Sequence, residues 1–235
     1  MIITISHLTR MRPPYICAAG LHDRVAVRPV VMGQLDKKWL RSNGGMFAIG
    51  AAVDLGPVKP VGAAPEHEDH RFDPAAARFA GMTDARTFWR LLEQIAQPSL
   101  DSIFGDDLVK RGRWRGRWSC AVNPGSGAAS LGCLKVCGLP QMSIQGLGPR
   151  PGLRLAITDP VLGKLDLAIT DVRFFADDLI TVNEAAVNSV QDRINSGVQL
   201  LLSVGLTRAT VPENDPVHWL QVNNLHLRDD PTWNL

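Results

Sequence analysis

Residues 153–174 read LRLAITDPVLGKLDLAITDVRF, and residues 181–204 read TVNEAAVNSVQDRINSGVQLLLSV. The first stretch predicts two β-strands, 153–158 and 165–174, joined by a turn that contains Asp159-Pro160. The second predicts a helix, opened by a capping box at Thr181-x-x-Glu184 and closed by Gly197, and then a strand over 198–204. This order of elements decides the fold of the C-terminal half.

Two flanking segments complete the pattern. Residues 130–139 precede it as a strand candidate, and residues 218–227 follow it as another, with polar and apolar side chains in alternation. Three strands, a helix and two further strands is the element order of an OB-fold, a small Greek-key barrel. The C-terminal half is therefore expected to be OB-like.

The N-terminal half shows the same order less clearly, because its fifth strand is uncertain. The strands and the short amphipathic segment expected there are residues 2–5, 15–20, 25–31, 35–40 (the amphipathic segment) and 47–55. Residues 83–97 have helical periodicity, with Thr83 or Asp84 as cap and Pro98 as stop. We predict a mainly β protein with minor α structure, built of two OB-like Greek-key barrels, residues 1–72 and 123–235, joined by a helical and basic connecting segment, residues 73–122.

Composition excludes several classes of protein. Among the 235 residues, 45% are hydrophobic and 20% are charged, which is typical of a globular protein and not of a disordered one. No apolar run reaches the roughly 20 residues needed to cross a bilayer, and the N-terminus does not read as a secretory signal, so we expect a cytoplasmic protein. The four cysteines are then expected to be reduced, and buried free thiols are favoured over a zinc site.

The net charge is only +2, so affinity for a polyanion would have to be local. Residues 110–118 read KRGRWRGRW, with five cations, two tryptophans and no acid. Guanidinium groups pair with phosphates and an indole can stack on a base, which makes this the candidate nucleic-acid-binding run: Lys110, Arg111, Arg113, Trp114, Arg115, Arg117 and Trp118. In a single strand, Arg113, Arg115 and Arg117 would share one side and the tryptophans the other. The alternative is a solvated loop whose tryptophans pack back onto the domain.

Two further segments carry polar groups of interest. Residues 221–226, QVNNLH, could present amides that read base edges from an exposed barrel face, although a hydrogen-bonded edge strand is favoured. Residues 66–70, EHEDH, together with Asp73, form the best metal candidate, although their spacing matches no strong signature and a solvated acidic linker is favoured. Nucleophile-elbow and phosphate-loop motifs are absent from the sequence, so we expect no enzyme, no cofactor and no metal.

Several strings resemble, in their order and spacing, the bacterial dual-OB-containing domain family over essentially the whole chain. They are TISHLTR (4–10), VRPV (27–30), Gly50 with VDLGPV (53–58), EDH (68–70), SLG (130–132) and HWLQVNN (218–224). The resemblance implies two OB modules and a nucleic-acid-binding or sensing role in prokaryotic defence against invading genomes. It implies no catalytic motif.

We therefore expect a non-catalytic module that binds or senses nucleic acid, with single-stranded DNA or RNA favoured. The alternative is a protein-interaction adaptor within a larger complex, whose barrels and tryptophans pack on a protein partner. A third possibility is a metal-dependent nuclease that uses the acidic segment 66–73. Salt dependence of binding separates the first two, because phosphate contacts weaken steeply as ionic strength rises.

Overall fold

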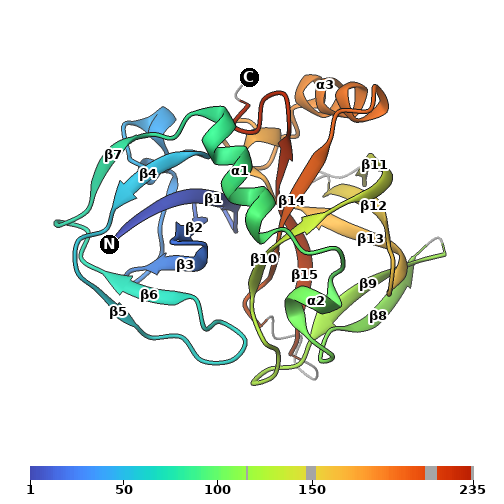
Figure 1. The fold of residues 1–235 in the computed structure, drawn as a ribbon, viewed down its shortest axis with the longest axis horizontal. Coiled ribbons are helices and arrows are strands. Elements are labelled where there is room, and N and C mark those ends of the chain that lie inside the picture. The colour runs from blue at the N-terminus through green and yellow to red at the C-terminus, as the bar shows by residue number, and fades with distance from the viewer. Residues whose placement is uncertain (115, 147–151, 210–215, 234–235) are drawn as a thin grey trace.

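The structure is a computed structural model that describes residues 1–114, 116–146, 152–209 and 216–233. As predicted, the protein is mainly β, with two curled sheets and few helices. Figure 1 shows the N-terminal sheet on one side and the C-terminal sheet on the other, with helix α1 lying across the joint between them.

The C-terminal sheet, within the described residues, comprises β8 (Val109–Trp114), β9 (Arg117–Val122), β10 (Leu131–Lys135), β11 (Cys137–Gln145), β12 (Gly152–Asp159), β13 (Gly163–Ile169), β14 (Leu200–Leu206) and β15 (His218–Leu227). Its antiparallel neighbours run β11–β12–β13 and β10–β14–β15, while β13 and β15 pair in parallel. Because β10 and β11 follow each other with one residue between them, these pairings form a ring of five strands, counting β10 and β11 as one. The predicted order of three strands, a helix and two strands is therefore observed.

Strand β9 is inserted where β13 and β15 diverge. It pairs in parallel with β13 at Leu165 and antiparallel with β15 at its other end, and β8 pairs with β9 as a hairpin. Residues 109–122 therefore belong to the C-terminal sheet, whereas the sequence placed them in the connecting segment.

The N-terminal sheet is formed, within the described residues, by β1 (Ile2–Arg10), β2 (Ile16–His22), β3 (Val25–Val30), β4 (Ala51–Asp54), β5 (Val58–Pro60), β6 (Asp69–Phe72) and β7 (Arg78–Met82). Strand β1 pairs with β2 and β4, β2 pairs with β3, and β3 pairs in parallel with β6. Strand β6 thus takes the place, next to the third strand, that β15 takes in the C-terminal half. Since β7 pairs with β4, only residues 83–108 lie between the two sheets, a shorter segment than the predicted 73–122.

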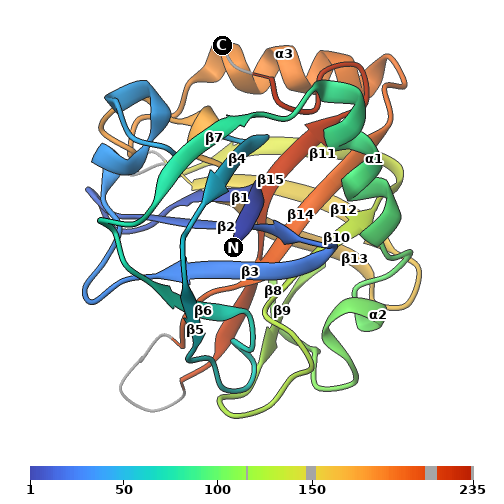
Figure 2. The ribbon, with the colours of Figure 1, turned by 60° about the vertical axis from the view of Figure 1, so that its left-hand side comes forward.

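Three α-helices lie in the described residues: α1 (Ala85–Ile95), α2 (Asp101–Phe104) and α3 (Glu184–Asn195). Asp84 caps α1 through a hydrogen bond from the Thr87 backbone N–H, as one of the two predicted alternatives. Helix α3 begins two residues later than a Thr181 cap would place it, because the N-cap is Asn183, whose side chain accepts from the Ala186 N–H. The Thr181 hydroxyl instead donates to Asp178 at 2.7 Å. In Figure 2, α3 lies along one end of the molecule, above the strands.

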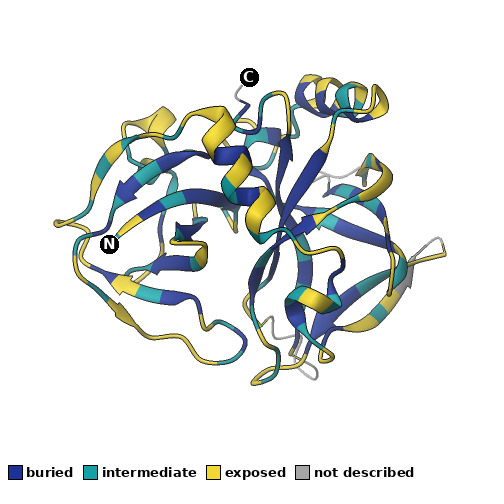
Figure 3. Ribbon diagram, in the orientation of Figure 1, coloured by how far each residue is buried: buried dark blue, intermediate teal, exposed yellow. Residues whose placement is uncertain are grey.

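The two halves share an apolar joint. Strands near the centre of Figure 3 are buried, and the core of the N-terminal half includes Cys133, Val172, Leu179 and Leu201 from the other half. The main chain also joins them, because the Arg10 N–H of β1 donates to the Thr170 carbonyl at 2.8 Å. The halves are therefore packed against each other.

Candidate nucleic-acid interface

The basic run forms a β-hairpin on the C-terminal sheet. Lys110 and Arg111 lie on β8, Arg117 and Trp118 lie on β9, and Gly116 takes a φ of 79° in the turn, which glycine adopts without steric cost. The register sets residue 113 opposite Trp118 and residue 114 opposite Arg117. Cross-strand partners lie on the same face of a sheet. The turn therefore brings a cation position beside a tryptophan position on each face, whereas a single strand would have separated them.

The described side chains of the hairpin have different environments. Lys110 and Arg117 are exposed, while Trp118 is half-buried and packs against the core, as the alternative interpretation expected for the tryptophans. Arg111 donates to the Asn123 side chain at 3.2 Å. Arg115 lies outside the described residues, and so do the side chains of Arg113 and Trp114. Lys110 and Arg117 are thus the cations that the described part of the hairpin offers to solvent.

Arg117 borders a groove that crosses the outer face of β11, β12 and β13. Two hollows, of about 310 and 190 Å³, share Arg117, Gln141 and Ala156 in their lining, so they lie next to each other. Their floor consists of the outward positions of strands whose alternate side chains fill the barrel core. Strands β12 and β13 are the second and third strands of the five-stranded ring.

The sequence analysis did not single out Lys164, which lies on this groove. Because Leu165 pairs with Trp118, Lys164 and Arg117 occupy neighbouring positions on adjacent strands, and both line the larger hollow. Nearby, Arg154 is held by Asp166 at 3.3 Å, so these two charges offset each other. Within the described residues, Arg117 and Lys164 form no ion pair, which leaves a positive charge at this edge of the groove.

The amide-rich strand is not exposed, and it is not an edge strand. Strand β15 lies inside the sheet, and Asn223, Asn224 and His226 are all buried. Asn224 joins the halves by accepting from the Leu8 N–H at 2.7 Å and donating to the Leu8 carbonyl at 3.2 Å. The side-chain amide of Asn224 therefore pairs with β1 through two hydrogen bonds, as the backbone of a neighbouring strand would.

The acidic segment 66–70 is neither a solvated linker nor, among the described residues, part of a group of metal-ligating side chains. Glu68 is buried, and its carboxylate accepts from the N–H groups of Ser130 and Leu131 and from the Ser130 hydroxyl. Asp69 bridges Arg28 and Arg208, at 2.5 and 2.6 Å. These carboxylates hold the N-terminal half to the start of β10 and to the segment after β14.

Two histidines are enclosed at the joint. Burial lowers the pKa of His226 to about 3 and that of His7 to about 4. His226 Nδ1 lies 3.1 Å from the Pro231 carbonyl and Nε2 lies 2.9 Å from the Ser203 hydroxyl. The Ser203 hydroxyl gives its own proton to the Ser6 carbonyl at 2.8 Å, so a neutral imidazole, which has one N–H, donates either to the Pro231 carbonyl or to this hydroxyl.

Helices in the described part of the chain are too short or too polar to span a membrane. No family model and no curated protein matches the sequence. A solved structure described as that of a murine DNA binding protein bound with ds DNA aligns with 97% of this chain and 96% of its own, at 6% identity. Its TM-score is 0.31, and a likeness of that extent carries no argument about fold or function.

Proposed function

We propose that this protein binds nucleic acid, with single strands favoured, in the groove on the outer face of the C-terminal barrel. The observation that carries the proposal is the adjacency of Arg117 and Lys164, two cations without ion-pair partners in the described structure, at the edge of the groove. Phosphate groups supply the missing negative charge, and a guanidinium can bind them bidentately.

The floor of the groove suits flexible strands. Gln141, Ser143 and Thr158 contribute groups that donate and accept hydrogen bonds, so they can contact exposed base edges. A duplex hides those edges, whereas an unpaired strand presents them. Trp118, half-buried beside Arg117 on β9, is the described tryptophan nearest the groove, and its accessible edge is where a base would stack.

The proposed role is binding without chemistry. The carboxylates that a metal-dependent nuclease would use, Glu66, Glu68 and Asp69, are engaged in contacts between the halves. The resemblance to the dual-OB-containing domain family extends the proposal to sensing of invading genomes in a prokaryotic cytoplasm. A protein-interaction adaptor is the competing proposal, and it predicts binding that depends little on salt.

The test measures fluorescence anisotropy of labelled single-stranded and duplex DNA and RNA at several salt concentrations. The double variant Arg117→Gln/Lys164→Gln should weaken binding and lower the log–log salt slope by about 1.4, because each phosphate contact to a single strand contributes about 0.7. A matched control is Lys59→Gln/Arg71→Gln, which removes the same charge from a cross-strand pair of exposed residues in the N-terminal sheet.

The control should bind as the unmodified protein does. Equal slopes for both double variants would show that the groove is not the contact surface. Failure of every oligonucleotide to bind at low salt would remove the proposal and favour the adaptor.

A further inference from the structure

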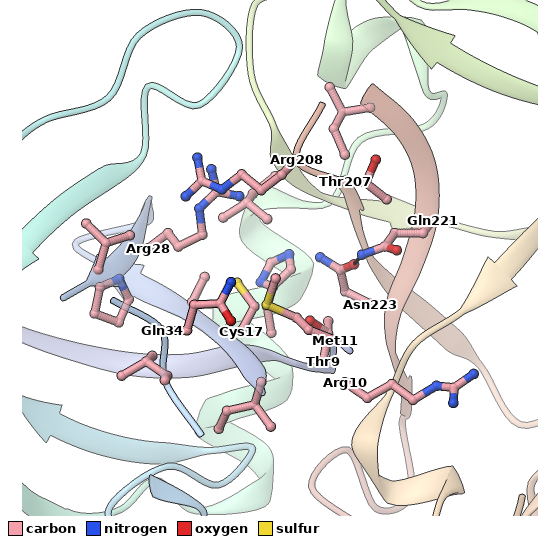
Figure 4. Close-up of a pocket in the computed structure, with 18 of the residues that line it drawn as sticks. Thr9, Arg10, Met11, Cys17, Arg28, Gln34, Thr207, Arg208, Gln221 and Asn223 are labelled. Carbon is pink, nitrogen blue, oxygen red and sulfur yellow. Dashed lines mark hydrogen bonds between the residues drawn. The ribbon is translucent and has the colours of Figure 1, made fainter. Parts of the chain in front are cut away.

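A second hollow lies between the two halves, away from the groove. It has a volume of about 390 Å³ and is formed by β1, β2, β3 and the segment after it on one side, and by β10, the end of β14 and β15 on the other. Figure 4 shows the side chains that converge on it, with the guanidinium groups of Arg28 and Arg208 close together and the amides of Gln221 and Asn223 on another wall. Small-molecule sites commonly have volumes of about 300–1,000 Å³.

The charged side chains that line the hollow are arginines, and two of them are paired with carboxylates behind the lining: Asp69 pairs with both Arg28 and Arg208, and Glu66 pairs with Arg208 at 3.3 Å. Arg12, Arg28 and Arg208 are among the described residues that line the hollow, and no aspartate or glutamate is. Arg10 borders it as well, but its guanidinium points away and donates to the Leu179 carbonyl at 2.9 Å. Asp69 binds Arg28 through one oxygen and Arg208 through the other, which fixes the two guanidinium groups beside each other. Arg28 is 3% exposed, and its Nη2 has no hydrogen-bond partner in the described structure.

An unpartnered guanidinium N–H in a buried position is costly, and a ligand oxygen would remove that cost. Arg208 is accessible from the same side, since 48% of its side chain is exposed. Two adjacent guanidinium groups suit a phosphate, because its oxygens can accept hydrogen bonds from several N–H donors at once.

The remaining walls suit a heterocycle. Pro29, Val30, Leu131 and Leu206 provide apolar surface, and Gln34 and Gln221 bring amides that can both donate and accept. The Gln221 side chain is oriented by its 3.0 Å hydrogen bond to Asn223 Oδ1. Amides held in this way are the groups that proteins use to read base edges.

We infer that this hollow is a binding site for a nucleotide, with the phosphate at Arg28 and Arg208 and the base against the amides and the apolar wall. The site goes beyond the proposed function, because it does not use the groove. The nucleotide can come from a free nucleoside monophosphate or from the 5′-phosphorylated end of a strand, since both present the same groups.

The experiment is isothermal titration calorimetry of the whole protein with AMP, GMP, CMP and UMP, and with the matching nucleosides and inorganic phosphate. At least one monophosphate should bind with 1:1 stoichiometry. The nucleoside and phosphate alone should bind at least about tenfold more weakly, and Arg208→Gln should weaken the monophosphate about 10- to 100-fold.

Gln34→Ala provides a second variant, because this exposed side chain can be removed without risk to folding, and it should weaken nucleotide binding but not phosphate binding. The groove variant Arg117→Gln/Lys164→Gln should bind the monophosphate normally, which separates failure of this inference from failure of the proposed function. A 5′-phosphorylated oligonucleotide that displaces the monophosphate more effectively than the unphosphorylated form would identify a strand end as the source. Its failure to do so would identify the free nucleotide.

The inference is overturned if none of the four monophosphates binds the folded protein at millimolar concentration. It is also overturned if nucleoside and monophosphate bind equally, or if Arg208→Gln leaves the affinity unchanged while thermal unfolding shows that the variant is folded.

Discussion

Replacing Glu68 by alanine is expected to lower the free energy of unfolding by about 2–5 kcal/mol, because it leaves buried donors without an acceptor. The carboxylate receives the Ser130 N–H at 2.9 Å and the Leu131 N–H at 3.2 Å on Oε1, and the Ser130 hydroxyl at 2.7 Å on Oε2. Each buried group left unsatisfied costs about 1–3 kcal/mol, and the two backbone N–H groups cannot rotate to find another partner. The loss is large against a typical stability of about 5–15 kcal/mol.

The variant Glu68→Gln keeps the hydrogen-bonding geometry of the side chain and removes its negative charge, so it separates the effects of the two on stability. Its Oε1 can still accept both N–H groups, and its Nε2 can donate to the Ser130 hydroxyl, which accepts as readily as it donates. The glutamine variant should therefore lose no more than about 1 kcal/mol, the ordinary net contribution of one hydrogen bond. Glu93→Ala, an exposed position on α1, is the matched control and should change stability by no more than about 0.5 kcal/mol.

Urea unfolding followed by both tryptophan fluorescence and far-UV circular dichroism measures these differences. Coincident transitions of the two signals would show that the halves unfold together and that one free energy describes them. If the alanine variant loses less than 1 kcal/mol, roughly the worth of a single hydrogen bond, Glu68 does not hold β10 to the N-terminal half. If the glutamine variant loses as much free energy of unfolding as the alanine variant, the negative charge of Glu68 stabilises the joint and the hydrogen bonds that it accepts do not.

Two further results are expected. Burial lowers the pKa of His226 and His7 below the value in the unfolded chain. Their contribution to stability is therefore complete above about pH 6.5 and is lost as the pH falls towards about 4 for His7 and about 3 for His226. The free energy of unfolding should fall by up to about 2.7 kcal/mol per pH unit if both take part. Urea midpoints that do not change between pH 7 and pH 5 would contradict this. Burial also raises the pKa of Cys120 and Cys133 to about 12, so a thiol reagent should label exposed Cys137 in the native protein and reach those two only after denaturation. Rapid native labelling of Cys133, located by peptide mass spectrometry, would contradict the packing of the joint.

The elements that the sequence predicted well are those with a local pattern, such as alternating polar and apolar side chains in a strand or a glycine after a helix. Strand β15 has the predicted bounds, 218–227, and the left-handed glycine that closes α3 is at Gly197, as predicted. Strand β6 was missed because it reads DHRF, a polar string with no strand signal. Its Asp69 is buried only because Arg28 and Arg208 approach it from elsewhere in the chain, and no local pattern shows that.

The candidate site was predicted in part. Residues 110–118 were chosen for their composition, and Arg117 does border a groove. Lys164 was not identified because the sequence analysis placed it, a single lysine, in the turn before the strand, whereas it lies on β13. Its significance comes from the pairing of β13 with β9, which joins residues 47 positions apart (165 minus 118). The amides of β15 were considered for a surface role, with a hydrogen-bonded edge strand favoured, and the fold instead places Asn224 inside the joint and Gln221 on the hollow between the halves.

The two halves differ in the pairing of the strand that runs parallel to the third strand, which is β6 in the N-terminal half and β15 in the C-terminal half. We attribute the hollow to that difference. In both, the first strand pairs with the second and the third pairs in parallel with the fifth, but β15 also pairs with β14, whereas β6 pairs with β5 and, in the described structure, not with β4. The N-terminal sheet therefore remains open, and the charged residues of β6 and the loop before it reach the other half. Asp69 then fixes Arg28 and Arg208 side by side. The charged site between the halves therefore depends on β6, whose pairing with β3 sets Asp69 opposite Arg28 and within reach of Arg208.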